Sequence, residues 1–185
     1  MSALDLDLMM RRATVDDAEF FFRIRNQISS VRFQASPRRS IEEVAALLAE
    51  DAETPLTRSA TGRFYWTGLV GDVPVVNLQI AVDGRDRSQH AATLGYSVAE
   101  EWQGQGIARA AVRHVLPIVF DPTGLSIERL EAVAAVGNIA SRRVLEATGF
   151  QFEGIQRGLL IIAGNRVDHA CYSLLDTDEV IRKLL

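Results

Sequence analysis

Several residue types that define whole classes of protein are scarce in this sequence. The 185 residues include a single cysteine, Cys171, so an internal disulfide is excluded, and the three histidines have no metal-like spacing with it or with one another. We therefore expect a reducing, intracellular setting and no metal site. Cys171 lies in an apolar run, which favours a buried structural thiol over a nucleophile.

Long hydrophobic runs and a basic N-terminus are missing as well. No apolar stretch approaches the length needed to cross a bilayer, and the opening MSALDLDLMM carries acids where a secretory signal would carry basic residues. The sequence thus predicts a cytoplasmic protein that does not associate with membranes.

An excess of positive charge is also absent. The formal charge is −4 at pH 7, whereas sequence-independent binding of nucleic acid needs a concentrated excess of Lys and Arg, so direct nucleic acid binding is not expected. No Pro/Gly/Ser-rich linker and no internal repeat divides the chain. We expect a single domain over residues 1–185, with its core at about 6–176 and a short C-terminal tail.

The N-terminal part of the chain reads as a strand followed by a helix. Residues 6–13 predict the strand, and Thr14 is a candidate N-cap for the helix. The next segment, SSVRFQASPRR, is expected to be a loop of the kind that carries specificity. The buried face of the helix should be made by apolar residues at helical spacing, which are Phe20, Phe21, Ile24 and Ile28.

The central part carries turn and cap signals. Ser40 followed by Glu43 is a capping-box signature for a second helix over about 40–52. The runs RFYWTGLV and VPVVNLQIAV flank a tight turn at Gly71 and predict an antiparallel hairpin. AATLGYSVA then predicts a strand, and GIARAAVRHVLPIVF predicts a helix that kinks or ends near Pro117.

The remaining elements alternate between strand and helix. We expect strands at about 127–135, 150–162 and 166–175, with a helix at about 138–148. The whole order predicts an α/β (α+β) fold in which helices cover the faces of a mixed, mostly antiparallel central sheet.

The segment EEWQGQGIARAA, residues 100–111, joins a predicted strand to a predicted helix through two glycines. The free amides and the dipole at such a helix start attract phosphate, and Gly104 and Gly106 let a ligand approach the backbone. A P-loop would need Lys and then Ser or Thr after its last glycine, and a dinucleotide fingerprint would need a small residue in place of Arg109. The remaining readings are another phosphate site or a helix start without a ligand.

Other segments give this loop a context. Gln103, Gly106 and Ala108 fit the pattern Gln/Arg, two residues, Gly, one residue, Gly/Ala of the GNAT N-acetyltransferase superfamily, which the chain resembles. GNIASRRVLEATGF and GNRVDHACYSLL are similar to later segments of its ribosomal-protein N-terminal (RimJ/RimL-like) acetyltransferase subgroup. This resemblance implies about seven strands, with a splay between those near 93–99 and 128–135.

The resemblance also implies that the co-substrate is acetyl-CoA and that no metal is needed. The loop amides would hold the pyrophosphate, and the backbone of the splayed strand would pair with the pantetheine arm. Arg142, which follows the asparagine closely, could reach the adenosine phosphate or simply cover the helix surface. The residues implied as coenzyme-binding are Val98, Ala99, Gln103, Gly104, Gln105, Gly106, Ile107, Ala108, Asn138 and Arg142.

Two residues are implied as catalytic, Ser141 and Asn138. Many relatives protonate the leaving thiolate with a tyrosine at the position of Leu145, so Ser141 is the best substitute here, with a packed small residue as its alternative. Asn138 would orient a substrate and could also be a helix N-cap. The general base stays open, because Thr93 stands where relatives often have Glu.

The function implied is transfer of acetyl from acetyl-CoA to a primary amine by direct attack. A protein N-terminal α-amine is the leading acceptor, and the acidic balance of the chain mildly favours a cationic one. The alternatives are a small-molecule N-acetyltransferase acting on an amino acid, polyamine or antibiotic, and a catalytically weak acyl-CoA-binding module. Edge strands could pair two copies into a homodimer.

Overall fold

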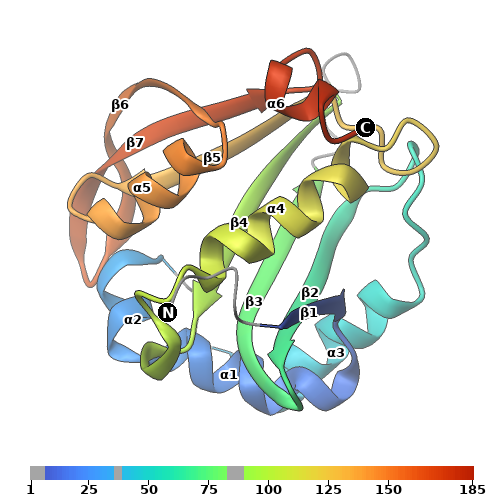
Figure 1. The fold of residues 1–185 in the computed structure, drawn as a ribbon. Helices are drawn as coiled ribbons and strands as arrows, with labels where there is room; N and C mark the ends of the chain where they lie inside the picture. The colour runs from blue at the N-terminus through green and yellow to red at the C-terminus, as the bar shows by residue number, and fades with distance from the viewer. Residues whose placement is uncertain (1–6, 36–38, 83–89) are drawn as a thin grey trace.

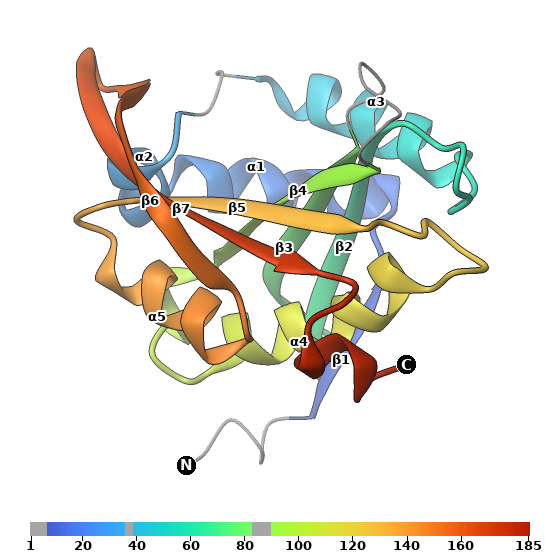
Figure 2. The ribbon, with the colours of Figure 1, turned by 90° about the horizontal axis from the view of Figure 1, so that it is seen from above.

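The computed structural model describes residues 7–35, 39–82 and 90–185. Seven strands form one sheet in the order β1-β2-β3-β4-β5-β7-β6, and helices lie on both of its faces (Figures 1 and 2). The strands are β1 (Leu8–Arg12), β2 (Gly62–Val70), β3 (Val73–Val82), β4 (Ala91–Val98), β5 (Arg129–Ala135), β6 (Gln151–Ile162) and β7 (Asn165–Leu175).

The sheet is mixed and mostly antiparallel, as predicted. β4 and β5 pair in parallel, and the other neighbouring strands pair antiparallel. In Figure 2 the N-terminal helices cover one face and the later helices cover the other. The first group is α1 (Ala18–Asn26), α2 (Ile28–Phe33) and α3 (Ile41–Ala52), and the second is α4 (Ile107–Phe120), α5 (Ile139–Ala147) and α6 (Glu179–Arg182).

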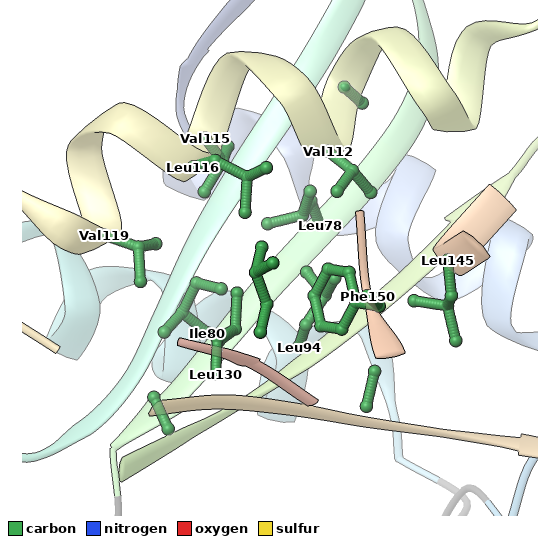
Figure 3. Close-up of a cluster of buried hydrophobic side chains, with 14 of the residues drawn as sticks. Leu78, Ile80, Leu94, Val112, Val115, Leu116, Val119, Leu130, Leu145 and Phe150 are labelled. Atoms are coloured by element: carbon green, nitrogen blue, oxygen red, sulfur yellow. The ribbon is translucent and has the colours of Figure 1, made fainter. Parts of the chain in front are cut away.

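The main core lies between α4 and the sheet (Figure 3). Side chains alternate along a strand, so Leu78 and Ile80 of β3 and Leu94 of β4 point toward α4. The same rule turns the polar residues of these strands, such as Asn77, Gln79 and Thr93, toward α1. The apolar cluster includes Leu78, Ile80, Leu94, Val112, Val115, Leu116, Val119, Leu130, Leu145 and Phe150.

The predicted splay between β4 and β5 is present. Their pairing is confined to Ala91–Thr93 against Arg129–Glu131, whereas β4 stays paired with β3 as far as Val98. The two halves of the sheet therefore separate after Thr93, which Figure 1 shows as a divergence of β4 from β5.

The capping box predicted at Ser40 and Glu43 is confirmed. Ser40 Oγ accepts a hydrogen bond from the Glu43 amide at 3.2 Å, and the Glu43 carboxylate accepts one from the Ser40 amide at 2.7 Å. Thr14 is the N-cap of a 3-10 turn, Val15–Asp17, whereas the N-cap of α1 itself is Asp17. Pro117 lies inside α4, which continues to Phe120.

Two predictions for the N-terminal helices are wrong. Gln27 has an extended backbone, with φ −67° and ψ 155°, so it ends α1 and resets the helical phase. Ile28 therefore begins α2 and is 80% exposed instead of extending the buried face. The segment expected to be a loop from residue 29 is helical as far as Phe33, and part of its remainder, 36–38, lies outside the described residues.

Cys171 is half-buried on β7, and burial raises the pKa of its thiol, in agreement with a structural role. No helix in the described ranges is both long and apolar enough to span a bilayer. The described residues also contain no group of three or more His, Cys, Asp or Glu that could hold a metal ion.

Candidate active site

The divergence of β4 from β5 opens a cleft of about 800 Å³. Its walls come from α1, α2, strands β2 to β7, the glycine loop and α5. Strand ends and helix starts surround the cleft. Backbone amides and polar side chains from segments far apart in sequence therefore line it.

The glycine loop forms one wall of this cleft. Gly104 and Gly106 have φ values of 74° and 82°, a left-handed conformation that glycine adopts without strain. Gly106 is the N-cap of α4. Among the described residues, no acceptor is hydrogen-bonded to the amides of residues 104–108. These amides and the α4 dipole make the wall suited to an anion.

Side chains tie this loop to α2. Gln103 Nε2 donates to Ser29 Oγ at 3.0 Å and to the Val98 carbonyl at 3.1 Å. The Glu100 carboxylate accepts from the Ser29 amide at 2.7 Å. The conformation of the loop is therefore held in place by contacts that leave its own amides open.

The two strand residues expected to pair with a pantetheine arm already have protein partners. The Val98 carbonyl accepts from Gln27 Nε2 at 2.8 Å as well as from Gln103. The Ala99 amide donates to the Val75 carbonyl at 2.9 Å, and Ala99 is 2% exposed. Val98 lines the cleft, and a ligand there would have to displace a glutamine side chain, whereas Ala99 is not among the lining residues.

Asn138 and Ser141 meet at the start of α5. Asn138 Oδ1 accepts from the Ser141 amide at 3.1 Å, so the N-cap is present, and both side chains line the cleft. Ser141 Oγ lies 2.9 Å from the hydroxyl of Tyr96 on β4. The Tyr96 hydroxyl also lies 3.2 Å from the Ser141 carbonyl.

Tyr96 is a residue that the sequence did not single out. Burial raises its pKa to about 12, against a smaller opposite effect of the hydrogen bond with Ser141, so its hydroxyl is neutral at physiological pH. Leu145, which stands at the tyrosine position of many relatives, is 1% exposed in the core. The cleft thus contains a phenol, but it comes from β4 instead of α5.

Three acids that could serve as a base through water, Glu131, Asp168 and Glu101, each contact another part of the protein. Glu131 accepts from Arg129 at 2.8 Å, Asp168 accepts from the Gly158 amide at 2.7 Å, and Glu101 lies 3.4 Å from Arg23. The described residues that line the cleft include no Asp or Glu.

His169 on β7 also lines the cleft and was missed. Its side chain is buried, and Nδ1 lies 2.9 Å from the Val167 carbonyl. A carbonyl can only accept, so Nδ1 carries the proton and Nε2 keeps a lone pair.

The two arginines of α5 have different surroundings. Arg142 Nε donates to the Tyr172 hydroxyl at 3.1 Å, and Arg142 is not among the residues that line the cleft. Arg143, one residue on, is exposed and does line it. A helix turns by about 100° per residue, which places these neighbours on different faces.

Comparisons with known proteins agree with this geometry. Residues 7–151 match the family model of the acetyltransferase (GNAT) domain. The chain is 37% identical over 114 residues to the putative ribosomal N-acetyltransferase YdaF of Bacillus subtilis, over 62% of this chain and 57% of YdaF. The chain thus spans little more than half the length of that curated relative.

Solved structures extend the likeness to the whole fold. The ribosomal-protein-S5-alanine acetyltransferase of Vibrio fischeri aligns with a TM-score of 0.78 and 26% identity, over 92% of this chain and 94% of that one. RimJ of Mycobacterium smegmatis, solved with CoA-disulfide, aligns with a TM-score of 0.76 and 23% identity, over 96% of this chain and 87% of that one. With the motif, the splayed sheet and the family model in agreement, the chain belongs to the GNAT acetyltransferase family.

Proposed function

We propose that this protein transfers the acetyl group of acetyl-CoA to a primary amine by direct attack. One observation carries the proposal: the same cleft is lined by the glycine loop with its open amides and by the hydrogen-bonded pair of Ser141 and Tyr96. The first suits the phosphates of the donor, and the second suits protonation of its leaving thiolate.

The residues of the loop fit a pyrophosphate. The left-handed glycines leave no side chain at positions 104 and 106, and Gly104, Gly106, Ile107 and Ala108 line the cleft, whereas Gln105 does not. Arg143 is better placed than Arg142 to contact a phosphate of the coenzyme, because Arg143 lines the cleft while Arg142 bonds to Tyr172. When bound, the coenzyme supplies the thioester whose acetyl group is transferred.

Ser141 and Tyr96 act together as the acid. As the amine nitrogen bonds to the acetyl carbon, the carbon–sulfur bond breaks and the thiolate takes a proton from Ser141 Oγ. The Tyr96 hydroxyl, 2.9 Å away and neutral, returns a proton to Ser141, and the proton that the attacking nitrogen loses as it becomes an amide restores the phenol through solvent. The side chain of Asn138 holds this end of α5 in place through the Ser141 amide.

His169 acts as the base. An ammonium group must lose a proton before it can attack, and His169 is the one histidine among the described residues that line the cleft. The Val167 carbonyl holds the tautomer that leaves Nε2 free to accept it.

The leading acceptor is the N-terminal α-amine of a protein, which the names of the ribosomal-protein acetyltransferase relatives support. The test is a coenzyme-release assay over N-terminal peptides, free amino acids, polyamines and aminoglycosides, with acetyl-CoA affinity measured by calorimetry. We expect tight coenzyme binding and turnover with one class. Binding without turnover on any amine would favour a coenzyme-binding module, and absence of binding would refute the proposal.

A further inference from the structure

The part of the cleft beneath α1 is lined by three arginines. Arg25 lies in the last turn of α1, Arg39 lies just before α3, and Arg63 lies near the start of β2. The chain segments that carry them are separated by a dozen residues or more, so the cluster exists only in the folded protein. Arg25 is half-buried, whereas Arg63 is exposed at the rim.

No ion pair with a described carboxylate holds any of these three arginines. Arg11, Arg12, Arg58 and Arg129 each form an ion pair with a carboxylate. No carboxylate of a described residue lies within ion-pair distance of the three cleft arginines, and the cleft lining contains no described Asp or Glu.

A neutral side chain holds Arg25 instead. Gln79 Oε1 lies 3.5 Å from Arg25 Nη2, a long contact between a cation and an amide. Gln79 fits against the sheet because its neighbour on β4 is Gly95; a Cβ at Gly95 would lie 3.0 Å from Gln79 Nε2. Gly95 therefore leaves room for Gln79, and the amide of Gln79 contacts the Arg25 guanidinium without neutralising its positive charge.

The charge of Arg25 is costly in this place. Its pKa is lowered chiefly by burial, against an opposite effect of Tyr65, and the nearby positive charges of Arg39 and Arg63 lower it further. Partial burial of a cation without a counter-ion, next to other cations, disfavours the folded state. An anion bound among the three would remove this cost, and guanidinium groups match the planar fork of a carboxylate.

We propose that the acceptor amine carries a carboxylate close to its amino group, and that Arg25, assisted by Arg39 and Arg63, binds it. The proposal rests on the acetyl transfer proposed above. It names the acceptor as a free amino acid or a peptide with an acidic N-terminal residue, and it excludes polyamines and aminoglycosides. The net charge of −4 indicated the opposite, because it counts acids all over the surface, whereas the cleft lining is cationic.

A matched set of acceptors tests the charge requirement. L-alanine, L-alaninamide and 1,2-diaminopropane have nearly the same size and carry a carboxylate, a neutral amide and a second amine in turn. Loss of one partner from a desolvated ion pair costs roughly 30-fold or more in specificity. We expect kcat/KM in the coenzyme-release assay to fall by at least about 30-fold from L-alanine to L-alaninamide, and again by at least about 30-fold from L-alaninamide to 1,2-diaminopropane. Equal or better turnover of the amide or the diamine would overturn the proposal.

A second pair of acceptors identifies the source of the carboxylate. Aspartyl-alaninamide and asparaginyl-alaninamide differ only in the charge of the first side chain and have no free C-terminus. Preference for L-alanine over both peptides assigns the α-carboxylate of a free amino acid. Preference for the aspartyl peptide assigns an acidic N-terminal residue.

Variants separate the arginines from the rest of the site. Arg25→Gln should abolish the preference for L-alanine over L-alaninamide while acetyl-CoA affinity stays unchanged. Arg58→Gln is the control, because Arg58 pairs with Glu128 on the surface and does not line the cleft. A preference that survives in Arg25→Gln and in Arg39→Gln would refute the assignment, provided that circular dichroism shows both variants folded.

Binding keeps this inference separate from the proposed activity. Calorimetry of L-alanine and of the aspartyl peptide into the CoA-saturated protein measures anion recognition without turnover. If no amine is acetylated but one of these ligands binds in an Arg25-dependent way, the acetyl transfer fails and the carboxylate site stands. If neither ligand binds, and an uncharged amine is acetylated, the carboxylate site fails and the acetyl transfer stands.

Discussion

The pair of Tyr96 and Ser141 makes a quantitative prediction about proton transfer. Ser141→Ala removes the proposed donor, and Tyr96→Phe removes the phenol 2.9 Å from Ser141 Oγ without changing the packing of its ring. If the two hydroxyls work as one relay, loss of either one breaks it. The double variant should then be no slower than the slower single variant.

The magnitude distinguishes a relay from simple orientation. A general acid contributes about 10²- to 10⁴-fold to the rate, so each single variant should lose at least about 100-fold in kcat. A hydrogen bond that only orients Ser141 is worth about 0.5–1.5 kcal/mol, so Tyr96→Phe would then lose only about 2- to 12-fold.

The assay is coenzyme release at saturating acetyl-CoA, with the affinity for acetyl-CoA measured separately by calorimetry. Because burial raises the pKa of Tyr96 to about 12, this group stays protonated across the assay range, and Tyr96→Phe should not alter the alkaline limb of the pH profile. Tyr172→Phe is the control, since its hydroxyl bonds to Arg142 outside the cleft. Losses in the two single variants that multiply in the double variant would refute the relay.

Three further changes have expected outcomes. Gly106→Glu should abolish acetyl-CoA binding, because residue 106 has φ 82° and a carboxylate there would repel phosphate; unchanged calorimetric affinity would contradict the pyrophosphate site. Gly68→Ala should lower the free energy of unfolding by about 1–3 kcal/mol, because its Cβ would lie 2.6 Å from Met10 Sδ, and a urea titration equal to wild type would refute this. Asp17→Asn should cost about 1–2 kcal/mol at pH 7 through its hydrogen bonds with Arg11. Although burial alone raises the pKa of Asp17, its hydrogen bonds hold the net pKa below the usual value, so this stabilisation should vanish as the pH falls below about 4; a difference between wild type and variant that persists there would contradict it.

Local signals in the sequence predicted the larger part of the fold. The capping box at Ser40, the turn at Gly71 and the alternation along the strands each depend on a few consecutive residues. The sequence did not predict the helix break at Gln27, because the side chain of this residue is hydrogen-bonded to the Val98 carbonyl, 71 residues away. Ile28 was consequently placed on the wrong face.

In the candidate site as well, the local sequence predicts some features, whereas others depend on contacts between distant segments. The motif from Gln103 to Ala108 and the cap at Asn138 are local, and the sequence predicted the position of both. Tyr96 could have been found only by knowing that β4 passes beside α5, since its partner is 45 residues away. His169 faces the cleft because β7 pairs with β5, a register that no short segment contains.

By itself the sequence determined the family, the order of elements and the loop that suits the donor, because glycine geometry, capping and hydrophobic periodicity act over a few residues. Only the tertiary structure decided what lines the cleft opposite that loop. The fold brings Arg25 of α1, Arg39 before α3 and Arg63 of β2 to one cleft, and no acid is among the described residues that line it. The chain as a whole is negatively charged, but the charged side chains described in the cleft where the acceptor would bind are positive.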